Sequence, residues 1–465
     1  MFQNGALVVN SLPQTQSLSS VPTGLQAASV NSLLETPVAT STPVQQTASL
    51  NLNDFGGMVI ASATSQFVVE GALSGDLAIN NNVVTSGFDT VYTVPDMIQA
   101  GDTSGLNLVS QSALFDASLV NDTDVVMTMK SFDDVVDNKS LAGFLEKNYA
   151  LGNNEAFFSD LKEIGNASAF KSTMSNITAT DTISRFAHED LTAMRELNLQ
   201  MNDKMFANND KQIYETQGSM NGFSFKNDNH SSATYALGTK RIAPRWKVGY
   251  AMSNTTLNTD DDNDTTRRGS LFGVFAPIGY ENGGLQMIST PQLAYQRAHY
   301  TRKGYNDTSY YGIIEKRIFA LMNEARYPVE VTKNFTLTPT VEFNAIAYNQ
   351  KGSESNKPYA LTMPNDNRLS VEAGIGLKAT KAFGNVNVNA GLMMYREFAD
   401  PYDIKMGMRG MEGSFNLYDN TNKYRGVANF GFDYDVNEWN LYGTVQHFME
   451  SDTHTNVKTG LKYRF

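Results

Sequence analysis

His454-Thr-Asn-Val-Lys-Thr-Gly-Leu-Lys-Tyr-Arg-Phe465 is the stretch that decides the fold, because it alternates strictly from Asn456 onward. Its odd-numbered positions carry Val, Thr, Leu, Tyr and Phe, and its even-numbered positions carry Asn, Lys, Gly, Lys and Arg. A period of two is typical of a β-strand with one apolar and one polar face. An apolar outer face and a cationic inner face suit a barrel with lipid around it and water within it. Taken alone, the stretch also fits an ordinary edge strand.

Similar alternation recurs upstream and predicts an all-β fold, a twelve-stranded antiparallel transmembrane β-barrel over residues 212–465. The expected strands cover residues 212–225, 232–242, 245–256, 267–278, 285–298, 308–332, 335–348, 367–383, 386–397, 424–436, 439–450 and 454–465. Pro339 weakens the seventh strand, because a proline cannot donate a ladder hydrogen bond.

The lengths of the expected connections alternate between short and long. Short connections fall at residues 243–244, 279–284, 333–334, 384–385 and 437–438, and long ones at residues 257–266, 349–366 and 398–423. Short periplasmic turns and long outer loops are typical of outer-membrane barrels. A soluble β-sandwich has no physical reason to alternate its loop lengths in this way.

A polar helix is expected over residues 181–206, within a segment of pore helix and linker at residues 181–211. Its charged residues include Arg185, Glu189, Arg195 and Glu196, and its apolar stripe is narrow. A helix this polar is poorly suited to a dry core. We therefore expect it inside the water-filled barrel, with a solvent-exposed linker helix as the alternative. Strand parity places Lys378, Glu372, Arg425 and Lys458 on the inner face as its expected partners.

Three segments precede this helix. Residues 1–49 are rich in Ser, Thr, Gln, Val and Pro, which fits either disorder or the remnant of a larger domain, and we favour the remnant. Residues 50–130 are expected to be β-helix-like, with a β-sandwich as the alternative. Residues 131–180 show apolar spacings of three and four and are expected to be a helical junction. The short β-branched runs of the second segment lie at residues 58–61, 66–70, 77–80, 89–94, 106–110 and 125–129.

Charge and composition exclude several classes of protein. The net charge of −12 argues against a strongly basic nucleic-acid binder, and the absence of cysteine excludes disulfides and thiolate metal sites. No lysine or arginine precedes Lys130, and residues 1–14 lack the cationic and apolar regions of a secretory signal. We therefore expect the sequence to be a mature or truncated piece of a longer protein, with an unusual export route as the alternative.

Catalytic constellations are not apparent in the sequence. A Ser-His-Asp triad needs a histidine, and the first histidine is His188. The acidic run at residues 260–264 lacks the glycine and the final glutamate of an EF-hand loop, so a solvated outer loop is favoured over a calcium site. We therefore expect no catalytic residues, no cofactor and no metal, and we expect that the chain is not an enzyme.

A family resemblance rests on four stretches before the helix and on the order of elements after it. The four stretches are Leu106-Asn-Leu-Val-Ser, Phe115-Asp-Ala-Ser-Leu, Asp124-Val-Val-Met-Thr-Met and Asn138-Lys-Ser-Leu-Ala. Together they resemble the junction between passenger and barrel in autotransporters, closest to the subtilisin-type serine protease autotransporters. A helix followed by twelve strands resembles the autotransporter translocator domain over residues 181–465. With the junction, the resemblance covers residues 101–465.

This resemblance implies a barrel that inserts in the bacterial outer membrane and exports or displays its N-terminal passenger. Expected partners are the membrane lipid, the barrel-insertion machinery and the passenger itself. The alternatives are an adhesin or stalk that the barrel anchors, or the C-terminal fragment of a serine protease autotransporter whose catalytic domain is missing.

Two sets of residues take roles from the resemblance alone. The ending Tyr-Arg-Phe resembles the C-terminal signal of outer-membrane barrels, which makes Tyr463 and Phe465 the expected assembly signal. Some autotransporters cut their own passenger inside the pore with an asparagine side chain that attacks its own backbone carbonyl. Asn198, Asn202 and Asn208 are the candidates for such a residue.

Overall fold

The computed structural model divides the chain into two compact units. Unit 1 comprises Met1–Met174 with Gly410–Gly413, and unit 2 comprises Ser175–Arg409 with Ser414–Phe465. The structure describes residues 2–3, 6–9, 49–84, 86–206, 213–221, 227–261, 265–304, 308–417, 423–449 and 454–464.

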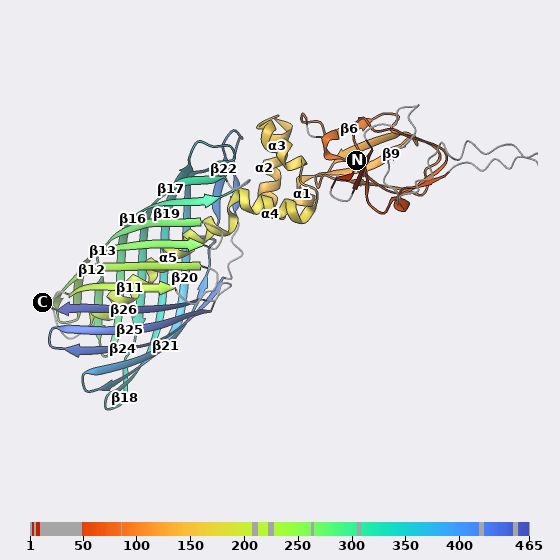
Figure 1. The fold of residues 1–465 in the computed structure, drawn as a ribbon. Coiled ribbons are helices and arrows are strands. Elements are labelled where there is room, and N and C mark those ends of the chain that lie inside the picture. The colour runs from red at the N-terminus through yellow and green to blue at the C-terminus, as the bar shows by residue number, and fades with distance from the viewer. Residues whose placement is uncertain are drawn as a thin grey trace, which may run out of the picture. The chain divides into compact units, whose positions relative to one another are not determined.

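Unit 1 begins with short strands (Figure 1). They are β1 (Phe2–Gln3), β2 (Ala6–Val9), β3 (Leu50–Asn51), β4 (Val59–Ala61), β5 (Phe67–Ile79), β6 (Val91–Val94), β7 (Ile98–Asp102), β8 (Leu106–Ser110), β9 (Phe115–Val120) and β10 (Asp124–Met129). β5 pairs in parallel with β3, β4, β7 and β8. β10 pairs antiparallel with β6 and β9. The parallel pairs stack Leu77 beside Val59 and beside Leu108, and Leu77 is fully buried.

Residues 66–70 and 77–80 were expected to be separate strands, but the structure joins them in β5. Gly75 lies within this strand at a φ of 93°, a backbone conformation that side chains with a Cβ rarely adopt. A Cβ there would lie 2.8 Å from Oδ1 of Asn51. The glycine thus serves a close approach between neighbouring strands rather than a turn.

Four helices follow in residues 132–178: α1 (Phe132–Val135), α2 (Lys139–Ala150), α3 (Glu155–Lys162) and α4 (Ala167–Thr178). Asn138 caps α2, because its Oδ1 accepts a hydrogen bond from the backbone N–H of Leu141 at 3.1 Å. The apolar faces of α1, α2 and α3 meet in an aromatic core, in which the rings of Tyr149 and Phe158 lie 5.2 Å apart.

Unit 2 is a ring of antiparallel strands around the helix α5 (Thr180–Met205) (Figure 1). Neighbouring strands pair in the order β11, β12, β13, β14 with β15, β16, β17, β19, β20, β21, β24, β25 and β26, and β26 pairs again with β11. Their bounds are β11 (Ile213–Asn221), β12 (Asn227–Ala243), β13 (Trp246–Asp261), β14 (Thr265–Phe275), β15 (Ile278–Asn282), β16 (Leu285–Lys303), β17 (Ser309–Arg326), β18 (Val329–Thr332), β19 (Phe335–Glu354), β20 (Leu361–Phe383), β21 (Val386–Glu397), β24 (Tyr424–Val436), β25 (Trp439–Met449) and β26 (His454–Arg464).

Prolines explain the two interrupted strands of the ring. β14 and β15 pair with the same neighbours, β13 and β16, and Pro277 separates them. β17 and β18 are separated at Pro328, and both pair with β19. Pro339 of β19 lies opposite this second gap, and its carbonyl accepts a hydrogen bond from the backbone N–H of Tyr327 at 3.1 Å. The missing donor of Pro339 therefore costs little in the ladder, and β19 runs through it.

The ring has a short-turn end and an opposite end. Residues 244–245, 283–284, 333–334, 384–385 and 437–438 connect strands at the short-turn end. Positive φ angles at Gly283, Asn334, Gly384 and Asn437 allow these turns to be tight. At the opposite end, β22 (Ile404–Met408) and β23 (Phe415–Leu417) lie in the long connection between β21 and β24. The connections expected at residues 257–266 and 349–366 are shorter than predicted, because β13, β19 and β20 extend into them.

Polarity is inverted across the wall of the ring. Ile375 and Phe430 are 66% and 59% exposed on its outer face, whereas Arg267 and Lys316 are 1% and 3% exposed on the inside. Contiguous exposed apolar side chains are unusual in soluble monomers and mark a surface that meets another apolar phase. Lipid is the phase that suits a ring with this outer face.

Candidate functional site: a polar helix within the strand ring

α5 lies inside the ring, with its side chains bonded to strands on several sides of it. The sequence of this helix is polar enough to need such partners, because buried charges are costly unless they are paired. Among the helices that the structure describes, none is both long and apolar enough to cross a membrane.

The N-terminal half of α5 is held by two carboxylates. Glu189 Oε2 accepts hydrogen bonds from Thr259 Oγ1 at 2.8 Å and from Arg267 at 3.0 Å. Asp190 pairs with the same Arg267 and accepts a hydrogen bond from Lys316 Nζ at 2.5 Å. The guanidinium of Arg267 also lies 4.7 Å from the ring centre of Phe186. β13, β14 and β17 are thus joined to one turn of the helix.

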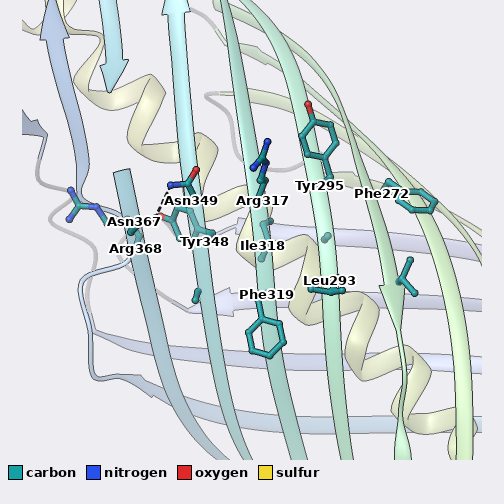
Figure 2. Close-up of a pocket in the computed structure, with 13 residues that line it drawn as sticks. Phe272, Leu293, Tyr295, Arg317, Ile318, Phe319, Tyr348, Asn349, Asn367 and Arg368 are labelled. Atoms are coloured by element: carbon teal, nitrogen blue, oxygen red, sulfur yellow. Dashed lines mark hydrogen bonds between the residues drawn. The ribbon is translucent and has the colours of Figure 1, made fainter. Parts of the chain in front are cut away.

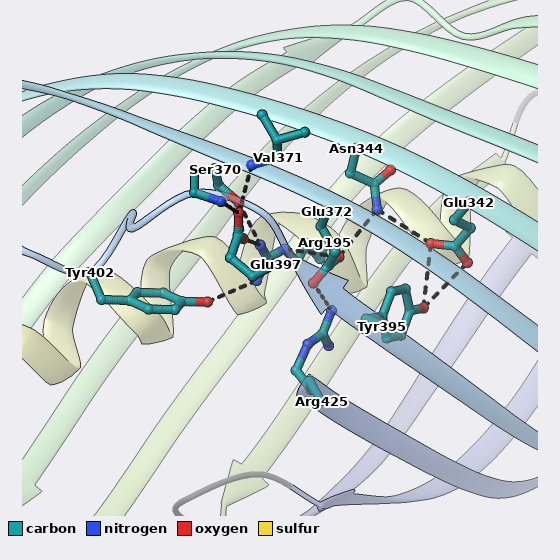
Figure 3. Close-up of polar contacts among 11 residues, drawn as sticks. Arg195, Glu342, Asn344, Ser370, Val371, Glu372, Tyr395, Glu397, Tyr402 and Arg425 are labelled. Carbon is teal, nitrogen blue, oxygen red and sulfur yellow. Dashed lines mark hydrogen bonds and ion pairs between the residues drawn. The ribbon is translucent and has the colours of Figure 1, made fainter. Parts of the chain in front are cut away.

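Arg195 joins the middle of α5 to β20 and β21 (Figure 3). Its guanidinium donates to Ser370 Oγ at 2.8 Å and to Glu397 Oε2 at 3.2 Å, and its Nε lies 3.4 Å from Glu372 Oε1. Glu372 also accepts a hydrogen bond from Arg425 at 2.7 Å. Both arginines therefore share a carboxylate, and a planar guanidinium suits several acceptors at once.

Tyr402 completes the surroundings of Arg195, because its hydroxyl lies 3.2 Å from the guanidinium as a hydrogen-bond partner. Glu397 is held in place in turn, since it accepts a 2.6 Å hydrogen bond from Ser370 Oγ and a 2.7 Å bond from the backbone N–H of Val371. Figure 3 shows Ser370 and Glu397 gathered around Arg195, with Tyr402 beside them.

Two asparagines occupy the C-terminal half of α5. Asn198 Oδ1 accepts a hydrogen bond from Gln292 at 2.9 Å. Asn202 is more extensively bonded: its Nδ2 donates to Glu324 Oε2 at 3.0 Å, and its backbone carbonyl accepts from Arg326 at 3.4 Å. Arg326 also donates to Glu324 at 3.3 Å. Asn202 thus has a carboxylate bonded to its side-chain amide and a guanidinium bonded to its backbone carbonyl.

An apolar stripe on α5 packs against β12, β13, β14, β17 and β19. Leu191 and Met194 contact Ile318 and Ile346, and Leu197 and Met201 contact Leu237 and their neighbours. Near the end of the helix, Gly279 allows Phe206 to lie close to the wall, because a Cβ on Gly279 would be only 2.9 Å from the Phe206 ring. Apolar packing and ion pairs therefore hold the helix to overlapping sets of strands.

The contacts give α5 a direction through the ring. Arg302, near the opposite end, donates to the carbonyl of Asn176 at 3.2 Å, just before the helix. Asn202 meets β17 near the short-turn end, where β17 stops at Arg326. A 26-residue helix is roughly 39 Å long, enough to traverse an apolar layer of about 30 Å. The chain upstream of α5 is therefore connected to the end opposite the short turns.

A scan of family models decides the affiliation of the chain. The autotransporter β-domain model matches residues 205–446, which is more than half of the 465 residues. The chain belongs to the autotransporter β-domain family. The expectation of an outer-membrane autotransporter barrel is thereby confirmed.

Two solved autotransporter domains are among the structures that this chain matches. The translocator domain of the autotransporter NalP from Neisseria meningitidis is 15% identical with a TM-score of 0.49, and the match covers 61% of this chain and 98% of that one. The β-domain of the Bordetella autotransporter BrkA is 14% identical with a TM-score of 0.40, and the match covers 55% and 99%. The comparison with curated proteins gives no match.

The residues predicted for the pore helix of this autotransporter can be compared with those in the structure. Glu189 and Arg195 lie within the ring, and Arg195 pairs with Glu372, an inward residue expected from strand parity. Glu372 pairs in turn with Arg425, a second residue expected on the inner face. The side chains of Arg185 and Glu196 lie outside the described residues. Asn208 and Phe465 also lie outside them.

Several site residues were missed by sequence reasoning, among them Asp190, Arg267, Lys316 and Glu397. Alternation on β17 was ambiguous, because its inner face carries Ile314 and Ile318 beside Lys316, and its outer face carries Arg317 beside Phe319. A search for a charge at an inward parity on each strand would have found Arg267 and Lys316. Across the described ranges, no group of three or more acidic or histidine side chains is arranged to hold a metal ion.

Aromatic side chains gather near the short-turn end of the barrel. The rings of Trp439 and Tyr463 lie 4.7 Å apart, and those of Trp246 and Tyr280 lie 4.9 Å apart. Trp246 and Trp439 are about half exposed on the outer face. Amphipathic rings at this level are typical of the boundary between membrane and water.

Proposed function

We propose that the chain is an autotransporter with a twelve-stranded translocator barrel, in which α5 is the part of the exported chain that stays in the pore. This count of twelve strands treats β14 and β15 as one interrupted strand, and β17 and β18 as another. One observation carries the proposal. Arg195, 4% exposed on α5, is bonded to β20 and β21, while Asp190 binds β14 and β17 from the same helix. The helix is therefore held to the wall from two sides.

The direction of α5 supports export of the preceding residues. The helix leads from the end of the ring opposite the short turns to the start of β11. Short turns face the periplasm in barrels of this class, so the chain before α5 would emerge outside the cell. We propose that residues 1–49 and 50–130 belong to the passenger, that residues 131–180 form the junction, and that residues 181–211 lead into the barrel at 212–465.

Parallel pairing in unit 1 supports a β-helix-like passenger remnant. β5 has parallel partners in β3, β4, β7 and β8, as stacked coils require. A displayed adhesin or stalk is one candidate role for this segment. A second is the end of a subtilisin-type protease autotransporter. In neither case would the barrel itself act as an enzyme.

At the other end of the chain, Tyr463 and Phe465 would be recognised by the barrel-insertion machinery.

Surface labelling tests the proposed orientation. An epitope tag placed after Asp122, at the exposed turn between β9 and β10, should be detected by antibody on intact cells or in the culture medium. A tag in the short turn after Lys333 should be reached only in permeabilised cells. Recovery of the first tag in the medium would favour a released passenger, and retention on cells a displayed one. Protection of the Asp122 tag in intact, barrel-containing cells would contradict export.

A second candidate function is self-cleavage after Asn202. The Nδ2 of this residue would attack its own carbonyl carbon, form a succinimide and break the bond to the nitrogen of Asp203. Glu324, 3.0 Å from Nδ2, would take the amide proton, and the leaving nitrogen would receive a proton as the bond breaks. Arg326 would stabilise the negative charge that develops on the carbonyl oxygen. Each molecule would cut itself once.

Mass spectrometry of the purified barrel tests this step. The expected product begins at Asp203, and both Asn202→Asp and Glu324→Gln should slow its formation by at least about tenfold, since a positioned acid or base contributes about 10²–10⁴-fold. Asn198→Asp is the matched control, because Asn198 bonds to Gln292 rather than to a carboxylate. A barrel that remains uncut, or one cut at another bond, would rule out Asn202.

A further inference from the structure

The outer wall of the barrel contains a hollow of about 590 Å³ (Figure 2). It lies across β14, β16, β17, β19 and β20. The strand register aligns five outward side chains into an apolar row, namely Val274, Leu293, Phe319, Ala347 and Leu369. Leu293 is 63% exposed and Phe319 is 53% exposed, and the small side chain of Ala347 leaves space beside them.

A mixed row lies one pair of residues nearer the end opposite the short turns. It consists of Phe272, Tyr295, Arg317, Asn349 and Asn367. The Asn349 amide donates to Asn367 at 2.7 Å, so these two side chains satisfy each other. Arg317 is exposed beside them, and no ion pair or hydrogen bond of its side chain is found within the described ranges. Figure 2 shows it at the level of Tyr295, with Leu293 and Phe319 beyond it.

The adjacent row, one pair of residues farther from the short turns, adds two cations. Arg297 and Lys351 both pair with Glu315, at 3.8 Å and 3.4 Å. The two rows thus hold three cations, Arg297, Arg317 and Lys351, and one carboxylate, Glu315, along the border of the apolar row that lies away from the short turns. Arginine and lysine near the edge of a membrane extend their charged groups toward the headgroups, and basic clusters there attract anionic lipids.

We propose that this hollow binds a phosphorylated lipid of the outer leaflet. An acyl chain would lie on the apolar row, and a phosphate of the headgroup would pair with Arg317, with Arg297 and Lys351 beside it. The planar guanidinium suits a bidentate phosphate contact, and the volume lies within the range of about 300–1,000 Å³ typical of small-molecule sites. This inference rests on the proposed orientation, which places the end opposite the short turns outside the cell.

The choice of lipid follows from charge and position. A zwitterionic lipid would bring its own cation to a patch where positive charge already prevails. An uncharged amphiphile would leave Arg317 without a partner at the border of the hydrocarbon, where an unpaired charge is costly. A phosphate group satisfies the arginine and leaves the acyl chain where water would otherwise meet Leu293 and Phe319.

Native mass spectrometry of the full chain in detergent tests the proposal. The probes are a diphosphorylated, multiply acylated glycolipid, the same glycolipid without its phosphates, and phosphatidylcholine. We expect the wild-type protein to retain one phosphorylated glycolipid about tenfold more tightly than either other probe. Arg317→Gln should lower that affinity by about tenfold, and Ala347→Trp should lower it similarly by filling the hollow.

Lys333→Gln is the matched control, because Lys333 is an exposed cation in a short turn at the far end of the barrel. It should bind the lipid as the wild type does, and heat-modifiable migration should show that all variants are folded. Equal affinity of the wild type and Arg317→Gln, or equal retention of the dephosphorylated glycolipid, would overturn the proposal. The proposal would also be overturned if Arg317→Gln abolished a dimer of barrels and left lipid retention unchanged. The epitope-tag experiment tests the orientation separately.

Discussion

Asp190 of α5 and Lys316 of β17 form a 2.5 Å ion pair inside the barrel, with side chains that are 1% and 3% exposed. Arg267 pairs with the same aspartate. One carboxylate on the helix therefore balances two cations on the wall, and its removal would leave both without their main counter-charge.

Asp190→Asn should destabilise the folded barrel by about 3–5 kcal/mol, because breaking a buried ion pair leaves uncompensated charge. Glu189 would offset part of this loss, since it also accepts from Arg267. The measurement is the temperature at which heat-modifiable migration is lost in detergent. Glu330→Gln serves as the control, because Glu330 is exposed on β18. An unchanged transition in Asp190→Asn would show that the pair contributes nothing measurable.

Arg195 provides a test of geometry separate from charge. Arg195→Lys keeps the positive charge but cannot reach Ser370, Glu397 and Glu372 with one planar group, so it should cost about 1–3 kcal/mol. Arg195→Gln should cost more, because it also leaves two carboxylates with less positive charge nearby. Hydrogen exchange of peptides from α5 should rise in that order. If the lysine variant exchanges as the wild type does, charge alone holds the helix.

Unit 1 should show a pH dependence that comes from Lys162. Its ammonium donates to Gly87 O at 2.7 Å and to Tyr92 Oη at 2.9 Å, and burial among aromatic rings lowers the pKa of Lys162 to about 8. The unfolded chain, with an ordinary lysine pKa near 10.5, binds the proton more tightly than the folded one. Stability should therefore rise as the pH increases from about 8 toward 10.5.

Hydrogen exchange of residues 86–164, corrected for intrinsic rates, measures this effect in the intact protein. Protection should be greater at pH 9.5 than at pH 8. Burial raises the pKa values of the neighbouring Tyr92 and Tyr149 above the ordinary value of 10, which opposes their ionisation in this window. Lys162→Met should remove the difference between the two pH values. A wild-type difference that persists in this variant would assign the effect to another group.

Assembly should depend on the C-terminal aromatic residues. Deleting Phe465, or replacing it with aspartate, should reduce the yield of heat-modifiable barrel in outer-membrane fractions, since a charge on the lipid face near the interface costs up to about 1 kcal/mol and more at depth. Tyr463→Ala should have a smaller effect through its lost contact with Trp439. Wild-type yield and gel shift in the Phe465 variants would count against the signal.

Sequence alternation was sufficient to predict the positions of the strands, because the two faces of the barrel wall meet different solvents. β21 and β24 occupy their predicted residues, and β25 agrees to within one residue. Strand ends away from the short turns were underestimated, as in β16, which continues to Lys303. Those extensions are polar on both faces, since they leave the membrane, and hydropathy there no longer distinguishes strand from loop.

Partners inside the pore could be predicted only in part. Strand parity placed Glu372 and Arg425 on the inner face, but which of them meets Arg195 depends on the rotation and depth of α5. Glu397 was missed because it ends β21, where the backbone N–H groups of Val371 and Ala399 stabilise its carboxylate. Pairings of this kind arise from closure of the ring, which no local pattern records.

Ion conductance in planar bilayers tests the central claim most directly. The full chain and a variant that lacks residues 1–206 are compared after both are shown to be folded by heat-modifiable migration. If α5 occupies the pore, the truncated barrel should conduct ions at a clearly higher level than the full chain. Equal conductance with and without the helix would show that it does not fill the pore, and the export model would be contradicted.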